Sequence, residues 1–180
     1  MIRVLNIVGA MNRGGLETTL INIFRSIDKR KIIFDFMVLD NRKAAYDDEI
    51  KSLGGKIYCI PSRKKGITKN KKALEIFFSK HKEYKIIHQH VSSLSYIEPI
   101  KIAFKFGFPT RIIHSRNTQQ GGLFLHKYLH KYNQRKINIF ATDFFACSDL
   151  AAKWLYSNKR YNDKKYKIIK NRINTDKFQF

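Results

Sequence analysis

Short apolar runs alternate with amphipathic stretches along almost the whole chain, and this alternation limits the possible folds more than any other feature. Residues 2–8 form an apolar, β-branched run that predicts a buried strand, and a loop with three glycines follows at 9–15. Apolar residues then recur at spacings of three and four, which predicts a helix with one apolar face. These residues are Leu16, Leu20, Ile23, Phe24 and Ile27.

The same alternation continues to the end of the 180-residue chain. We predict further strands at 32–39, 56–60, 84–88, 110–114, 143–147 and 166–170. We predict further helices near 46–53, 70–81, 94–106, 123–140 and 149–157. Such a pattern is typical of a parallel sheet with helices on both faces. We therefore expect a single α/β domain over 1–180, with a Rossmann-like, doubly wound, mostly parallel sheet of about seven strands.

In sheets of this kind, ligands bind at the carboxyl ends of the strands. Five motifs stand there, each where a predicted strand ends. They are Gly14-Gly15-Leu16-Glu17, His88-Gln89-His90, the segment 111–117 (RIIHSRN), Ala146-Cys147-Ser148, and the segment 168–174 (IIKNRIN) with Phe178 beyond it. In this order, they resemble the motifs of family-4 glycosyltransferases with the GT-B fold, especially bacterial capsule and exopolysaccharide transferases.

Two departures from the family pattern stand out. Arg172 and Asn174 occupy positions where the family usually has Gly and Asp, and Arg116 occupies a position where a second His is common. Glycine would permit a tight turn that arginine resists.

The resemblance implies that the chain is the N-terminal, acceptor-side half of a GT-B enzyme, without the C-terminal domain that binds the donor. The parent protein would transfer a sugar from a nucleotide sugar to a lipid-linked or glycan acceptor, with retention at the anomeric carbon, as a hexosyltransferase. It would need no metal, and the isolated chain would be inactive. One alternative is a non-catalytic binding subunit of a split glycosyltransferase.

The resemblance also assigns roles to residues. Gly14 and Gly15 would offer backbone N–H groups to the donor diphosphate at a helix N-terminus, although a plain strand-to-helix turn explains them equally. His114 would act as the acid/base or substrate-polarising residue, although a strand-end histidine satisfied by backbone groups is the alternative.

Five further residues are candidates for the acceptor pocket: His90, Arg116, Asn117, Ser148 and Glu17. Helix capping alone would explain Ser148, and the helix dipole would explain Glu17 in a first turn. His88 is expected to point into the core, away from His90. His126 and His130 have a spacing that could hold zinc, but no third ligand is evident, so we expect a solvated helix face.

The net charge is unusual, because 36 basic and 14 acidic residues give +22. Two dense basic segments are candidates for an anionic surface: Arg63, Lys64, Lys65 and Lys69 in one, and Lys127, Lys131 and Arg135 in the other. Aromatic residues alternate with the second set, which is typical of an interfacial helix on anionic lipid. A nucleic-acid-binding α/β domain is the rival interpretation, and a solvated basic face is the simplest.

The location follows from two further observations. Cys59 and Cys147 are far apart, match no metal-binding spacing, and suggest a reducing compartment, with both residues on buried strand ends. No segment approaches the roughly 20 apolar residues of a membrane span. We therefore expect a cytoplasmic protein, associated with the inner face of the plasma membrane if the basic surface binds lipid.

Overall fold

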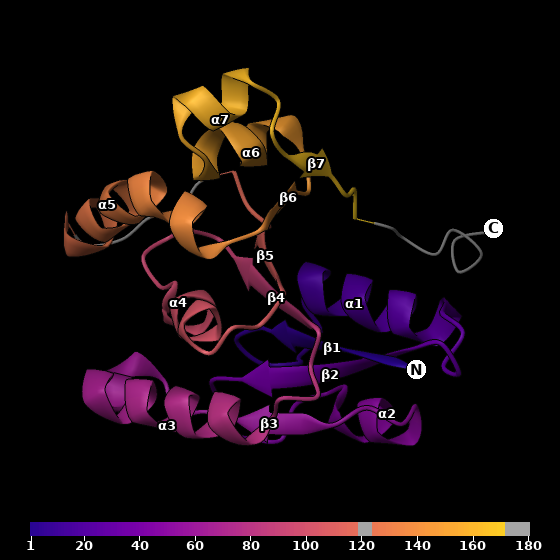
Figure 1. Cartoon of the computed structure of the whole chain (residues 1–180). Helices are drawn as coiled ribbons and strands as arrows, with labels where there is room; N and C mark the ends of the chain where they lie inside the picture. Colours follow the sequence, from indigo (N-terminus) through magenta and orange to yellow (C-terminus); the bar gives the residue numbers. More distant parts are fainter. Residues whose placement is uncertain (119–123, 172–180) are drawn as a thin grey trace.

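A computed structural model describes residues 1–118 and 124–171 and shows one seven-stranded sheet (Figure 1). The strand order is β3-β2-β1-β4-β5-β6-β7, and every neighbouring pair is parallel. The strands are β1 Ile2–Ile7, β2 Ile32–Val38, β3 Ile57–Cys59, β4 Ile86–Val91, β5 Thr110–Ser115, β6 Asp143–Ala146 and β7 Lys167–Ile168. The predicted Rossmann-like, doubly wound fold is confirmed, with each sheet pair parallel.

The helices are α1 Gly15–Ser26, α2 Asp47–Ser52, α3 Ile67–Lys80, α4 Glu98–Lys105, α5 Phe124–Phe140, α6 Asp149–Leu155 and α7 Asn158–Asn162. A 3₁₀ turn, η1, covers Arg63–Lys65. Right-handed crossovers require α1 and α2 to lie on one face and α3 to α6 on the other. Figure 1 shows α4 and α5 on the opposite side of the sheet from α1.

Alternate residues along each strand supply two separate cores. Ile87 and Ile113 belong to the larger apolar cluster, together with residues of α3 to α6. Phe36 belongs to the smaller cluster, with Phe24 of α1 and Ile50 of α2. Because β1 lies between β2 and β4, the chain reverses its direction of strand addition there, and this switch point is where such sheets bind ligands.

Three predicted helices differ from the observed ones, and each difference has a local cause. Helix α3 begins at 67, because Gly66, with φ at +126°, ends the 3₁₀ turn and allows the helix to start earlier. Helix α4 begins only at 98, because residues 92–97 form a loop. The predicted helix 149–157 ends at 155 as α6, and α7, which the sequence did not predict, follows it; Ser148 and Ser157 cap the two helices.

The expectation of two buried cysteines was wrong for Cys59, which is exposed, while Cys147 is half-buried. Cys59 ends β3, and β3 is an edge strand with a neighbour on one side only. In the described part of the chain, no helix has the length and apolar character needed to cross a membrane.

Candidate functional site

Strand β4 extends to Val91, three residues beyond the prediction, so the whole His88-Gln89-His90 motif lies in the strand. Side chains two residues apart in a strand share a face, so His88 and His90 lie together and Gln89 points to the opposite face. The prediction that His88 points away from His90 into the core was therefore wrong. The two imidazole rings lie with centroids 4.0 Å apart.

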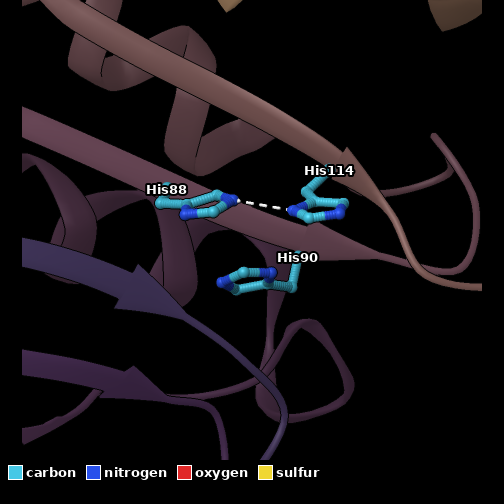
Figure 2. A group of neighbouring side chains, drawn as sticks. All are labelled: His88, His90 and His114. Atoms are coloured by element: carbon cyan, nitrogen blue, oxygen red, sulfur yellow. Dashed lines mark hydrogen bonds between the residues drawn. The ribbon is translucent and has the colours of Figure 1, made fainter. Parts of the chain in front are cut away.

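His114 of β5 completes a group that we call the histidine cluster, formed by His88, His90 and His114 (Figure 2). The parallel register places His90 beside His114. The dashed line in Figure 2 joins His88 Nε2 to His114 Nδ1, which are 3.0 Å apart. Phe145 of β6 packs edge-on against His88 and His114, which closes the far side of the cluster.

The cluster is uncharged at neutral pH. Burial lowers the pKa of His88 to about 3 and that of His114 to about 2, and the nearby Arg116 guanidinium acts in the same direction. Burial also holds the pKa of His90 well below its usual range. Each ring is therefore a neutral imidazole, able to donate through one nitrogen and accept through the other.

The tautomer of His90 follows from its partners. Arg116 Nε donates to His90 Nδ1 over 3.1 Å, and a guanidinium can only donate. The proton of His90 is therefore on Nε2, which lies 3.1 Å from Asn6 Oδ1 and donates to it. Asn6 is fully buried, and its Nδ2 has no partner among the described residues.

A metal ion fits this cluster poorly, although one ring nitrogen of each histidine lies within 4.8 Å of the others. His88 and His114 already share a hydrogen bond, and both nitrogens of His90 are engaged. A divalent cation would also meet the positive charge of Arg116 without any carboxylate in the cluster to offset it. The donor set suits an internal hydrogen-bonded cluster better than a metal centre.

His114, the predicted catalytic residue, is fully buried. Its Nε2 is enclosed and has no partner in the part of the chain that the structure describes. His114 does not line the nearby pocket, whereas His90 does. A catalytic role for His114 stays a prediction, whereas His90 lines the pocket and His88 is the partly exposed histidine of the cluster.

The pocket has a volume of about 320 Å³ and lies at the switch point between the ends of β1 and β4. Its apolar side is formed by Ile7, Val8, Leu39 and Val91. Its polar side is formed by Gln89, His90, Ser92, Ser93, Ser95 and Tyr96. An apolar surface with a few polar groups at one side is typical of small-molecule sites.

The glycine loop leads directly into α1, as predicted. Gly14 is the N-cap and Gly15 is the first helical residue, with open space around its Cα. Glu17 lies in the first turn, as expected, and folds back toward Gly14, because a Cβ added at Gly14 would lie 2.3 Å from Glu17 Oε2. The Glu17 carboxylate thus occupies the N-terminal end of α1.

Of the remaining pocket candidates, Arg116 joins the site and two others make only local contacts. Besides His90, Arg116 donates from Nη1 to Asn171 Oδ1 over 3.0 Å. Burial lowers the pKa of Arg116 to about 10, against the opposing effects of Cys147 and Glu17. Asn117 accepts from the Thr118 N–H, and Ser148 caps α6 by accepting from Ala151 N. Arg172, Asn174 and most of the 116–122 loop lie outside the described residues.

Residues 92–97, which we call the pocket loop, are held by side chains from four different elements. Trp154 of α6 donates to Ser92 O over 2.8 Å, and Asn133 of α5 donates to Leu94 O over 2.6 Å. Arg63 of η1 donates to Ser95 O over 2.8 Å, and Gln89 of β4 donates to Tyr96 O over 2.9 Å. These positioning residues were missed by sequence reasoning, apart from Arg63, which had been assigned to an anionic surface.

The expectation of a solvated face for His126 and His130 was correct only for His126, which is exposed. His130 is 3% exposed, accepts from Leu94 N over 3.1 Å and stacks on Trp154. Helical spacing could have revealed this, because His130, Asn133 and Ile137 share the face that points toward the protein.

The two basic segments differ in their surroundings. Arg63 is half-buried and stacks over the Tyr96 ring, whereas Lys64, Lys65 and Lys69 are exposed. Lys127, Lys131 and Arg135 are exposed along α5, where the exposed apolar side chains of the chain are also concentrated. These are Phe124 (84% exposed), Leu125, Tyr128, Tyr132 and Ile139.

Two named proteins resemble the chain in sequence over nearly its full length. It is 30% identical over 181 residues to "Putative glycosyltransferase EpsF" of Bacillus subtilis, covering 98% of the chain and 46% of EpsF. It is 26% identical over 174 residues to "Capsular polysaccharide biosynthesis glycosyltransferase CapH" of Staphylococcus aureus, covering 95% of the chain and 47% of CapH. No protein-family model matches the chain.

A solved structure with a similar fold is MurG of Acinetobacter baumannii. The TM-score is 0.60 at 8% identity, over 99% of the chain and 48% of MurG, a level of identity that shows the fold alone. The chain spans about half the length of each relative that it matches. It is thus a homologue of bacterial glycosyltransferases over about half of their length, with the Rossmann-like architecture of one half of a GT-B fold.

Proposed function

We propose that the chain is the acceptor-side half of a retaining, hexosyltransferase-type enzyme of capsular polysaccharide or exopolysaccharide synthesis. The complete enzyme transfers a sugar from a nucleotide sugar to a lipid-linked or glycan acceptor. One observation carries the proposal: the pocket between β1 and β4, with His90 in its wall, lies at the same sheet edge as the N-terminus of α1. The relationship to EpsF and CapH supports sugar transfer as the chemistry.

In this proposal the donor diphosphate lies against the first turn of α1. The helix has 12 residues, and its first backbone N–H groups and its dipole favour an anion. Glu17 must turn away from Gly14 when the diphosphate binds, because two negative groups would otherwise share one helix end. The other half of the enzyme supplies most donor contacts, so the isolated chain is inactive.

The acceptor occupies the pocket, where neutral His90 orients a hydroxyl group. Arg116 sets the tautomer of His90 and brings positive charge next to it. The catalytic role for His114 requires its unpartnered Nε2 to meet a reacting group or a water. We therefore propose His90 as the first histidine to contact the acceptor, with His114 behind it.

A hybrid protein tests this function. The chain replaces the matching half of EpsF, and release of nucleoside diphosphate is measured with a panel of nucleotide sugars and a lipid extract. We expect turnover by the hybrid, none by the 180-residue chain alone, and a loss of about 10²-fold in His90→Ala. The proposal is wrong if the folded hybrid turns over no donor under conditions in which EpsF itself does.

A second form of the proposal keeps the acceptor site but has no covalent link between the acceptor-binding and donor-binding halves. The chain would then be a non-catalytic subunit that binds the acceptor beside a separate donor-binding subunit. Mixing the 180-residue chain with the separately produced other half of EpsF distinguishes the two forms. Turnover by the mixture supports the two-subunit form, and turnover by the covalent hybrid only argues against it.

We also propose that α5 lies on an anionic membrane surface at the cytoplasmic side. A helix turns by about 100° per residue. Phe124, Tyr128, Tyr132 and Ile139 therefore share the outward face that is exposed. Lys127 and Lys131 flank this stripe on one side and Lys136 on the other, and Arg135 lies within it, so apolar side chains can enter the interface while the basic groups meet lipid phosphates.

Vesicle co-sedimentation tests the surface. We expect binding to vesicles that contain phosphatidylglycerol, little binding to phosphatidylcholine alone, and a loss of about 10-fold in Tyr128→Ser/Tyr132→Ser. Ile76→Ser is the matched control, because Ile76 is 46% exposed on α3, away from the stripe and from both basic segments. Salt-sensitive binding to duplex DNA without binding to vesicles would instead support a nucleic-acid partner.

A further inference from the structure

Gln89 carries an unsatisfied polar atom beside the pocket. Its side chain lines the pocket and the residue is 2% exposed. Its Nε2 donates to Tyr96 O over 2.9 Å. Its Oε1 is buried and has no partner among the described residues. Buried acceptors without partners are uncommon in folded proteins, so this oxygen requires an explanation.

The orientation of the Gln89 amide is fixed by its surroundings. A flip by 180° would place Oε1 against Tyr96 O, so that two acceptors would face each other without a proton. Tyr96 cannot move away easily, because its hydroxyl donates to Asn70 Oδ1 over 3.1 Å and its ring lies under the Arg63 guanidinium. Oε1 is therefore the amide atom without a partner, and it belongs to a residue that lines the pocket.

The other lining groups indicate what that molecule is. Among the described residues that line the pocket, none carries a formal charge, since the low pKa of His90 keeps its ring neutral. Ser92, Ser93 and Ser95 bring hydroxyl groups to the polar side, and Ser93 Oγ donates to Ser95 Oγ over 2.9 Å. Such a lining matches a neutral molecule with several hydroxyl groups and one apolar face.

We infer that Gln89 is a specificity-determining residue, whose Oε1 accepts a hydrogen bond from a hydroxyl of a neutral sugar unit in the acceptor. The inference rests on the proposed function and names the part of the acceptor that enters the pocket. Because the pocket loop fixes the amide, a sugar without that hydroxyl would leave Oε1 unpaired. Sites built in this way discriminate strongly against deoxy analogues.

The test uses the ¹⁵N-labelled 180-residue chain and NMR. The Gln89 side-chain NH₂ signal is assigned by its loss in Gln89→Met, which keeps the chain length of the side chain. The probes are methyl glycosides of glucose, galactose, mannose and N-acetylglucosamine, followed by the monodeoxy analogues of the one that binds best. We expect at least one glycoside to shift the Gln89 signal and the backbone signals of 92–97.

We expect Gln89→Met to weaken this binding by at least about 10-fold, and one deoxy analogue to lose as much. Tyr161→Phe is the control, because Tyr161 lies on α7 and does not line the pocket, so this variant should bind the probe as the wild type does. If Gln89→Met does not fold, the deoxy analogues decide the question on the wild-type chain, where removal of one hydroxyl should weaken binding by at least about 10-fold.

Two outcomes overturn the inference. One is a folded Gln89→Met that binds the glycoside as well as the wild type does. The other is a panel in which no glycoside shifts the Gln89 signal. Neither outcome touches the proposed function, which is decided by nucleoside diphosphate release in the EpsF hybrid. In that hybrid, Gln89→Met should raise the KM for the acceptor and leave kcat within about 3-fold.

Discussion

Strand β4 directs consecutive side chains into two differently constructed walls of the same site. His88 and His90 point to one wall, where imidazole rings, Asn6 and the Arg116 guanidinium contact one another. Gln89 points to the other, where it and the side chains of Asn133 and Trp154 donate to carbonyl groups of the pocket loop. We call these the histidine wall and the amide wall.

The histidine wall and the amide wall are stabilised in different ways. The histidine wall depends on protonation, because its rings are buried only as long as they are neutral. The amide wall depends on particular donors, because four carbonyls of the pocket loop each have a partner from a different element. Acid should therefore disturb the first wall, and single substitutions should disturb the second.

The largest effect is expected from acid on the histidine wall. The pKa of His88 is about 3 and that of His114 about 2 in the folded chain, against about 6.5 when unfolded. Below pH 6.5 the unfolded chain binds more protons, so this stability is complete above that pH and declines as the pH falls. Between pH 6 and pH 5 we expect the free energy of unfolding to fall by about 2–4 kcal/mol in urea denaturation.

Two variants sharpen the acid experiment. His114→Asn removes one buried ring and should reduce the pH dependence by about 1 kcal/mol per pH unit. His126→Gln changes an exposed ring and should leave the pH dependence as in the wild type. Equal pH dependence in all three proteins would contradict the histidine wall as the source of acid sensitivity.

The next largest effect is expected in the amide wall. His130→Ala/Asn133→Ala removes both contacts of α5 to Leu94 and leaves its buried N–H and C=O without these partners. We expect the free energy of unfolding at pH 7 to fall by about 2–3 kcal/mol, with faster hydrogen exchange in residues 92–97. His126→Ala, at an exposed position of α5, is the comparison; exchange that stays slow in the double variant would argue against a side-chain-held loop.

A smaller effect is expected for Arg116→Lys. Lysine keeps the positive charge but cannot reproduce the guanidinium geometry that reaches His90 and Asn171 together. We expect a loss of about 1–2 kcal/mol and a changed ¹⁵N chemical shift for His90 Nδ1. Arg135→Lys, on the exposed face of α5, should change neither. An unchanged His90 signal in Arg116→Lys would show that Arg116 does not set the tautomer.

The smallest effect is expected in the glycine loop. In Gly14→Ala the new Cβ would displace only the flexible end of Glu17, so the free energy of unfolding should change by less than about 1 kcal/mol. Nucleotide-sugar turnover in the EpsF hybrid should nevertheless fall, because the methyl group occupies the proposed diphosphate position. A loss of stability as large as that of the amide-wall variant would contradict the expectation that Gly14 affects donor binding and not folding.

Much of the fold could be predicted from the sequence, because strand and helix periodicities are local. Each strand followed by an amphipathic helix was recognisable, and Glu17 in the first turn of α1 and Ser148 at the start of α6 followed from helix-end chemistry. The wrong predictions concern residues whose surroundings are formed by distant parts of the chain. His130 was expected in solvent because its basic and aromatic neighbours suggest a surface helix, and only the packing of α5 on the pocket loop buries it.

The sequence by itself determined the alternating α/β architecture and which segments meet at the carboxyl edge of the sheet, because parallel strands bring their ends together. Only the tertiary structure decided how these segments contact one another. Trp154 and Ser92 are 62 residues apart in sequence, and His90 and Asn6 are 84 apart. Burial of His114, the free oxygen of Gln89 and the two walls depend on such long-range contacts, which no local pattern encodes.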